Sequence, residues 1–236
     1  MNRTGIAAGV AAVAFGALLW SPAETVSATQ APDARVAYRI ERDGQPVGSY
    51  AVRVYETAAG EDIDSQLTIA TRVGPFKVRV THESAEGWSN KGQLRRFASE
   101  TDRNGDKLAV RALPAADGRL LVEAEGKATR ADANILTNNF TQTGARFNGH
   151  AEKVALMDVL SGAIRPSTIV PRGRQQIACD LGTCEARRYD IVLDETGKVS
   201  HQLWLDADGV VVRMIANTRF GIAFTYVRDH FERRAA

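Results

Sequence analysis

Apolar and polar residues alternate with a period of two along most of this chain, and this alternation restricts its fold more than any other feature. The last fifth, Arg187–Phe231, shows it most clearly, because three alternating runs are separated by short breaks at 195–197 and 206–209. Glycine and aspartate in these breaks tolerate the backbone angles of a chain reversal. A further run from Arg219 through Tyr226 predicts a fourth strand, so the region is predicted to be an antiparallel meander.

The first half of the chain shows the same pattern. Short alternating runs follow one another between residues 36 and 124, and turn signals such as Asp43-Gly44 and Asn104-Gly105 separate them. A strict period of two gives each strand one buried face and one exposed face. The pattern therefore predicts an all-β sandwich, a barrel or a curved sheet.

Residues 126–149 interrupt this alternation. They are polar and rich in asparagine, threonine and glycine, with few apolar residues among them. We interpret this stretch as a crossover or lid loop rather than a linker between domains.

The stretch that follows, residues 151–164, is the one predicted helix. Gly162 and Pro166 are suited to end it. The apolar residues at helical spacing are Val154, Met157 and Leu160. A helix with a single apolar stripe must bury that stripe, so we expect it to pack on one face of the sheet.

The first 28 residues predict a cleavable secretory signal peptide. Arg3 precedes a mostly apolar run from Ile6 to Trp20, and small residues follow up to Ala28. The alternative is a membrane anchor, but the run is shorter than the roughly 20 residues that a bilayer span needs. We therefore expect export to the periplasm, no transmembrane segment after cleavage, and a single β-rich domain over residues 29–236.

The overall charge is close to balanced. The formal net charge is +2, and acidic and basic residues are interspersed. No block of like charges favours binding to nucleic acid or to an acidic membrane surface.

The chain has two cysteines, Cys179 and Cys184, separated by four residues that include Gly182. An exported protein folds in an oxidising compartment, where an even pair of cysteines favours a disulfide. The flanking residues resemble the arms of a hairpin, so we predict a bridge that clamps the hairpin. The alternative is a redox or metal-binding dithiol, which no predicted helix start or neighbouring histidine supports.

Several short motifs resemble an exported bacterial family known only as a domain of unknown function, of the 6134 type and related to the 3108 type. They are Tyr38-Arg39-Ile40, Asp43-Gly44, Val47-Gly48, a Glu86-Gly87-Trp88 turn with Gly92-Gln93-Leu94, Asn104-Gly105, Thr137-Asn138-Asn139-Phe140 and the 205–211 turn. More distantly, the order of elements resembles the unclosed β-barrels of periplasmic lipoprotein carriers such as LolA. The resemblance implies a strongly curved antiparallel sheet, or unclosed β-barrel, with one principal helix packed on the concave face and an apolar pocket there.

No residue set predicts a reaction. The four histidines lack the short spacing of metal ligands, and neither a nucleophile elbow nor a glycine-rich phosphate loop occurs. We therefore expect no catalytic residue, metal or cofactor, and we predict that the protein is not an enzyme.

The remaining candidate site is a cavity on the concave side of the sheet. One helix would leave apolar volume open to a ligand unless the 126–149 loop folds inward. The candidate wall residues are Tyr50, Phe76, Phe97, Phe140, Met157 and Leu160. The alternative is a fully packed core made of the same residues.

These observations leave two principal functions open. The first is a periplasmic protein that binds or carries an apolar, lipid-like ligand or a lipidated partner in its concave cavity. The second is a non-catalytic envelope scaffold or protein-interaction module with a packed core, acting through strand edges or the 126–149 loop.

Overall fold

The computed structural model describes residues 30–142, 146–179, 182–218 and 221–234. Within these ranges the chain forms one fifteen-stranded sheet and no helix. The first eight strands are β1 (Ala34–Arg42), β2 (Gln45–Thr57), β3 (Gly60–Val73), β4 (Phe76–Ser89), β5 (Leu94–Arg103), β6 (Asp106–Pro114), β7 (Leu120–Ala124) and β8 (Lys127–Ala131). The others are β9 (Leu136–Thr137), β10 (Glu152–Met157), β11 (Ile164–Cys179), β12 (Gly182–Leu193), β13 (Val199–Leu205), β14 (Val211–Asn217) and β15 (Ala223–Arg233).

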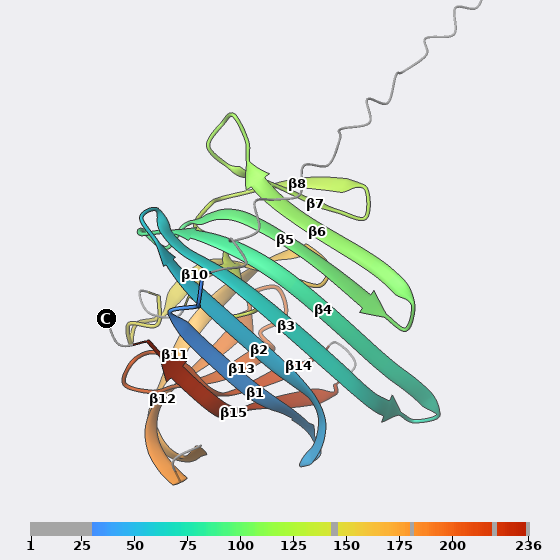
Figure 1. Cartoon of the computed structure of the whole chain (residues 1–236), viewed down its shortest axis with the longest axis vertical. Helices are drawn as coiled ribbons and strands as arrows, with labels where there is room; N and C mark the ends of the chain where they lie inside the picture. The colour runs from blue at the N-terminus through green and yellow to red at the C-terminus, as the bar shows by residue number, and fades with distance from the viewer. Residues whose placement is uncertain (1–29, 143–145, 180–181, 219–220, 235–236) are drawn as a thin grey trace, which may run out of the picture. The chain divides into compact units, whose positions relative to one another are not determined.

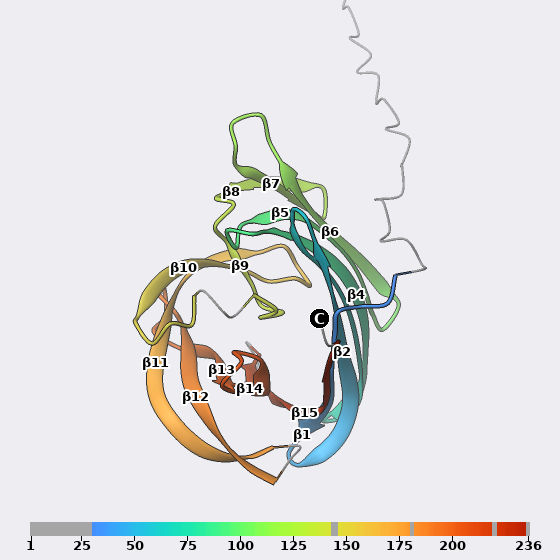
Figure 2. The same ribbon diagram turned by 60° about the vertical axis from the view of Figure 1, so that its left-hand side comes forward.

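Successive strands lie beside one another except β8 and β9, and the first strand also pairs with the last. β1 pairs with β2 on one side and with β15 on the other, both in antiparallel register. The sheet order therefore runs from β8 back to β1, then from β15 back to β9. Figures 1 and 2 show the sheet curving around a central space, with β8 and β9 as its two unpaired edges. The predicted mainly β, unclosed barrel is thus confirmed.

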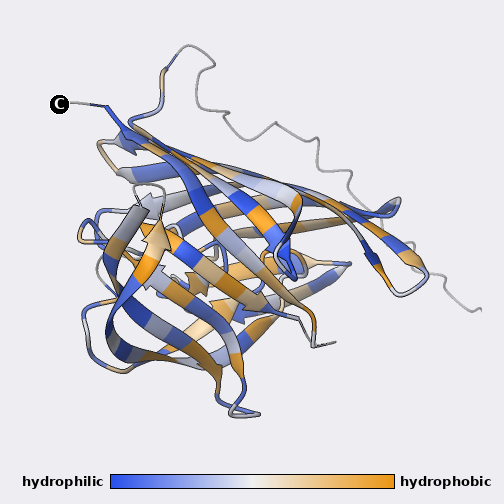
Figure 3. Cartoon of the chain, turned by 90° about the horizontal axis from the view of Figure 1, so that it is seen from below, coloured by the Kyte–Doolittle hydropathy of each residue, from blue (hydrophilic) through white to orange (hydrophobic). Residues whose placement is uncertain are grey.

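Buried and exposed residues alternate along the strands of this sheet, as the period of two in the sequence predicts. In β1, for example, Val36, Tyr38 and Ile40 are buried, while Arg35 and Arg39 between them are exposed. Buried apolar residues from both halves of the chain form one core on the concave side. Figure 3 shows the same alternation of polar and apolar residues along the strands.

The two-residue hairpin turns follow the sequence signals. Asp43 and Gly44 have φ angles of 53° and 74°, and Asn104 and Gly105 have 56° and 96°. Two successive residues with positive φ define the type I′ turn, whose twist matches that of the flanking strands. These turns fix the register of β1 with β2 and of β5 with β6.

The predicted helix at 151–164 is wrong. Residues 152–157 form β10, which pairs with β11 on one side and with β9 on the other. A tight turn follows, in which Asp158 accepts backbone hydrogen bonds from Leu160 and Gly162. Val154 and Met157 are buried at a spacing of three, but Leu156 between them is buried as well, which a strand in the core explains better than a helix.

The interruption at 126–149 is not an external lid. It contains β8 and β9, and then the chain turns into the concave side, as Figure 2 shows. We call residues 132–142 and 146–151 the plug. Its apolar residues Ile135, Leu136, Phe140 and Phe147 are all buried in the main core.

The predicted disulfide is not formed, although the predicted hairpin is present. Cys179 lies opposite Gly182 and Cys184 lies opposite Ile177, so the two cysteines occupy diagonal positions and no S–S bond joins them. Diagonal neighbours across two strands are about 7–8 Å apart, which exceeds the Cα separation that a disulfide spans.

Two predictions fall partly or wholly outside the described residues. The proposed signal peptide, residues 1–28, lies outside them, and so do residues 219–220 at the start of the predicted fourth strand of the final meander. In the part of the chain that is described, no helix has the length and hydropathy to cross a membrane.

Candidate ligand pocket

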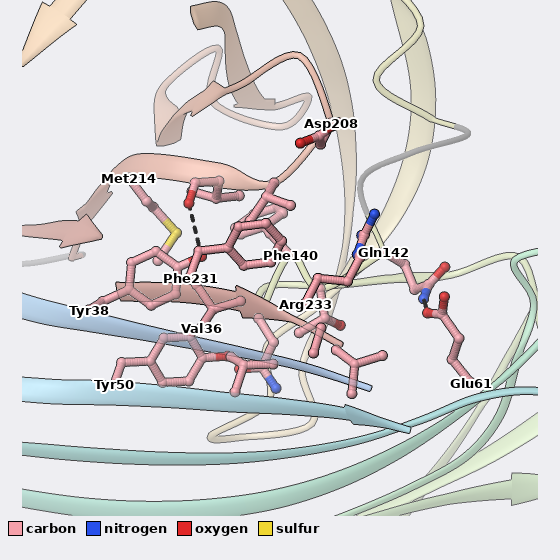
Figure 4. Close-up of a pocket in the computed structure, with 18 of the residues that line it drawn as sticks. Val36, Tyr38, Tyr50, Glu61, Phe140, Gln142, Asp208, Met214, Phe231 and Arg233 are labelled. Atoms are coloured by element: carbon pink, nitrogen blue, oxygen red, sulfur yellow. Dashed lines mark hydrogen bonds between the residues drawn. The ribbon is translucent and has the colours of Figure 1, made fainter. Parts of the chain in front are cut away.

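A pocket of about 250 Å³ opens on the concave side between β1, β2, β15, the β13–β14 turn and the plug (Figure 4). Its volume lies just below the roughly 300 Å³ at the lower end of typical ligand sites. Antiparallel pairing brings its central wall together, because Val36 of β1 lies directly opposite Val52 of β2. Segments from both ends of the chain therefore build one site.

Aromatic side chains form the deep part of this pocket. Tyr38 stacks on Tyr50 with ring centroids 5.7 Å apart, and Tyr50 meets the edge of Tyr226 at 5.9 Å. Burial raises the pKa of all three phenols above the ordinary value, so they remain uncharged at neutral pH. This wall is therefore apolar and neutral.

One phenol in this wall lacks a hydrogen-bond partner. The Tyr38 hydroxyl donates to the carbonyl of Val211 at 3.0 Å, whereas the buried Tyr50 hydroxyl forms no hydrogen bond of normal geometry among the described residues, although the nearby Ser65 hydroxyl partly opposes the rise in its pKa. A buried polar group without a partner costs about 1–3 kcal/mol. The Tyr50 hydroxyl is thus available to a polar atom of a bound ligand.

The mouth of the pocket carries mainly negative charge. Its lining includes four carboxylates but a single guanidinium, that of Arg233. The carboxylates belong to Asp33, Glu56, Glu61 and Asp208. Figure 4 shows Glu61 and Gln142 on the side of the pocket away from Tyr38 and Tyr50, and the Gln142 amide donates to the Glu61 carboxylate.

The plug closes the neighbouring part of the concave side through a buried carboxylate. Glu86 of β4 is 2% exposed and accepts hydrogen bonds from Trp88 at 2.7 Å and Asn139 at 2.6 Å. Thr137 and Thr141 also donate to it, at 3.3 and 3.2 Å. Burial raises the pKa of Glu86, and these hydrogen bonds partly oppose the rise. We call these five residues the Glu86 cluster.

Further polar side chains line the same side of the sheet. Ser84 bonds both Ser65, at 2.7 Å, and Asn139 of the plug, at 3.1 Å. His82 is 2% exposed and lies 2.8 Å from the Thr101 hydroxyl, and burial lowers the pKa of its imidazole to about 4. The inner face of β3–β5 thus carries several buried polar side chains, and the plug bonds two of them, Ser84 and Glu86.

The six residues predicted to line a pocket separate into three groups. Tyr50 and Phe140 line the pocket. Phe97 and Met157 are buried in the core, and Leu160 packs against that core from the turn after β10. Phe76 is 71% exposed at the tip of the β3–β4 hairpin and does not reach the pocket.

Phe140 combines burial with an unusual backbone. Its φ of 49° lies in the left-handed region, which a bulky residue rarely adopts. Its ring contacts that of His201 at 4.9 Å, with an angle of 66° between the planes. The plug therefore presents this ring to the pocket at a conformational cost that the surrounding contacts must offset.

Sequence reasoning missed the partners that make the site. The sequence predicts a turn at Glu86 and Trp88, but both residues lie within β4, and the Glu86 carboxylate accepts a hydrogen bond from Asn139 of the plug. The Thr137–Phe140 motif gave no signal of this role, because threonine and asparagine are also common in exposed turns and loops. No group of three residues that could hold a metal ion occurs within the described ranges.

The chain belongs to the family described as "Domain of unknown function (DUF6134)", whose model matches residues 38–229. The matched region includes the Glu86 cluster and most of the pocket wall. No curated protein matches this sequence.

Solved structures show that the fold is shared. A "Beta-barrel-like Protein" of the domain of unknown function DUF1849 from Brucella abortus has a TM-score of 0.65 at 11% identity, covering 87% of this chain and 99% of that one. A DUF1089 family protein from Pseudomonas aeruginosa has a TM-score of 0.45 at 13% identity, covering 69% and 87%. At these identities only the fold of the Brucella protein bears on this chain.

Proposed function

We propose that this protein is a non-enzymatic, exported binding or carrier protein that holds one small apolar group, such as an alkyl chain of a lipid or lipidated partner, in the pocket. The observation that supports the proposal is the 250 Å³ volume that the plug leaves open beside a neutral aromatic wall. The plug and the buried core fill the neighbouring part of the concave side, so the remaining space is local.

The charges at the mouth favour one kind of ligand. Four carboxylates against one guanidinium disfavour an anionic head group there by like-charge repulsion. A neutral or cationic polar end is therefore the better fit. The unpartnered Tyr50 hydroxyl adds a hydrogen bond for a polar atom within the pocket.

The test uses N-phenyl-1-naphthylamine, a neutral fluorophore that brightens in apolar sites. We expect the wild type to enhance its emission, and decan-1-ol or decylamine to displace it at lower concentration than decanoate. Val52→Phe places a ring in the middle of the pocket, since Val52 is 5% exposed in its wall, and should abolish the enhancement.

Ala51→Phe is the matched control. It adds the same ring to the same strand, but on the opposite face, because successive residues of a strand point to opposite sides. It should leave the enhancement unchanged. An enhancement that survives Val52→Phe, or none with the wild type, contradicts the proposal.

The proposed export has its own test. Amino-terminal sequencing of the protein recovered from the cell envelope should begin just after Ala28. A chain that retains its first 28 residues contradicts cleavage at that site.

A second candidate, a scaffold or interaction module, is favoured by the free edge of the sheet. Four of the five residues of β8 are exposed, and this edge strand pairs only with β7. An exposed strand edge can accept an extended peptide. The hypothesis of a scaffold or interaction module gains support if no apolar probe binds and Val52→Phe leaves every property of the protein unchanged.

A further inference from the structure

The β3–β4 hairpin extends beyond its neighbours in the sheet. β2 pairs with β3 only as far as Ile69, and β5 pairs with β4 only from Val80 onward. Residues 70–79 therefore form a two-stranded hairpin with no strand on either side, and Figure 1 shows it reaching past the β5–β6 turn. We call residues 70–79 the tip hairpin.

The two faces of the tip hairpin differ in chemistry. Val73 lies opposite Phe76, and Thr71 lies opposite Val78, on the face that continues the concave side from Ile69. Ala70 lies opposite Arg79, and Arg72 opposite Lys77, on the other face. The hairpin is thus apolar on one face and basic on the other.

Its apolar face ends in an unusually exposed ring. Phe76 is 71% exposed, and only one other large apolar side chain among the described residues, Leu113 at 57%, is comparably exposed. A solvent-exposed aromatic ring at the end of a projecting element favours insertion into another apolar phase.

The basic face keeps its charge available. The side chains of Arg72, Lys77 and Arg79 are exposed, and none of them forms an ion pair within the described ranges. The nearby turns add Arg42, Arg103 and Lys107, against the acidic residues Asp43, Asp102 and Asp106. The fold therefore gathers at one end a positive charge that is dispersed in the sequence.

The base of the tip hairpin is held in place. The Arg42 guanidinium donates to the carbonyl of Arg72, and the Asn104 side chain accepts the backbone N–H of Arg79 at 2.7 Å. Gly74, with a φ of 57°, permits the tight turn at the end. The ring and the charges are thus presented by an anchored element.

We propose that the tip hairpin docks the protein on an anionic lipid surface, with Phe76 entering the interface and Arg72, Lys77 and Arg79 facing the lipid phosphates. An apolar face beside several cations is the combination that binds anionic interfaces, because apolar burial and electrostatic attraction add. Glu61 at the pocket mouth lies near the start of β3, whereas the tip hairpin lies at the end of that strand, so docking and pocket binding can be tested separately.

The experiment is co-sedimentation of the protein with phosphatidylcholine vesicles, with and without phosphatidylglycerol. We expect binding only when phosphatidylglycerol is present, and weaker binding as salt rises. Each basic side chain near such a surface contributes a factor of about five, so Arg72→Ala, Lys77→Ala and Arg79→Ala together should weaken binding about a hundredfold.

Two single variants test whether the Phe76 ring itself binds the vesicle or whether any exposed apolar side chain does so. Phe76→Ala should weaken vesicle binding by about tenfold. Leu113→Ala removes the other exposed large apolar side chain, near the far end of β6 from the β5–β6 turn, and should have no effect. Val52→Phe should also bind vesicles normally, whatever its effect on the pocket.

Three results overturn this proposal. They are equal binding to vesicles with and without phosphatidylglycerol, equal losses for Phe76→Ala and Leu113→Ala, and a dimer in sedimentation velocity that Phe76→Ala dissociates. The last result identifies a second copy of the chain as the occupant of the apolar face.

Discussion

The two sides of the concave face differ in the side chains that line them and in how far the plug covers them. On the β3–β5 side, polar residues face inward and the plug covers them through the Glu86 cluster. On the β1–β2–β15 side, the wall is aromatic and apolar, and a volume of about 250 Å³ remains open. The difference indicates that the Glu86 cluster, together with the buried apolar residues of the plug, holds the plug on the β3–β5 side and leaves the β1–β2–β15 side partly open.

The largest expected effect comes from removing that anchor. Glu86→Ala leaves the buried Trp88 and Asn139 donors without their acceptor, so the free energy of unfolding should fall by roughly 3–5 kcal/mol. Urea denaturation measures this change. Glu86→Gln keeps one accepting oxygen and should lose less. A loss below about 1 kcal/mol for Glu86→Ala would show that the anchor does not hold the plug.

Acid should lower the stability of the protein through His82, which lies on the same β3–β5 side of the concave face. The pKa of His82 is lowered from 6.5 to about 4, so the folded state favours the neutral imidazole. The contribution of the neutral imidazole to the free energy of unfolding is complete above pH 6.5 and is lost as the pH falls toward 4. The total loss is roughly 3 kcal/mol.

His82→Gln provides the control for this pH dependence. It replaces the titrating ring with an amide that can still bond Thr101, so its stability should change less between pH 6.5 and pH 4. Parallel stability–pH curves for the wild type and this variant would exclude His82 as the source.

The smallest expected changes in stability come from Tyr50 and Tyr38, on the β1–β2–β15 side of the concave face. Tyr50→Phe removes a buried hydroxyl that has no partner and should raise the free energy of unfolding by up to about 1 kcal/mol. Tyr38→Phe removes the hydrogen bond to Val211 and should lower it by about 1 kcal/mol. Thermal denaturation of the two variants compares them directly, and a stability loss for both would show that Tyr50 is partnered in solution.

The sequence predicted the sheet well because the evidence for it is local. The period of two identifies buried faces, and pairs such as Asn104-Gly105 identify reversals, so most strands within residues 36–124 and 187–231 could be located, whereas β8, β9 and β10 could not. The pairing of β1 with β15 joins residues nearly two hundred positions apart, and no local pattern in the sequence predicts it.

The errors have physical causes. In residues 151–164 a short strand and a following turn place apolar residues three apart, which mimics a helix. Phe76 carries the alternation of a buried strand, but the β3–β4 hairpin extends past β2 and β5, so nothing covers the ring. The pocket could not be delimited in advance, because its volume depends on how far the plug folds inward.

Isothermal titration calorimetry with decan-1-ol tests the central claim most directly. Burial of an alkyl chain in the open side of the concave face predicts one site per wild-type chain, a negative change in heat capacity, and no site in Val52→Phe. Absence of binding to the wild type, or equal binding to both proteins, would show that no ligand occupies this volume.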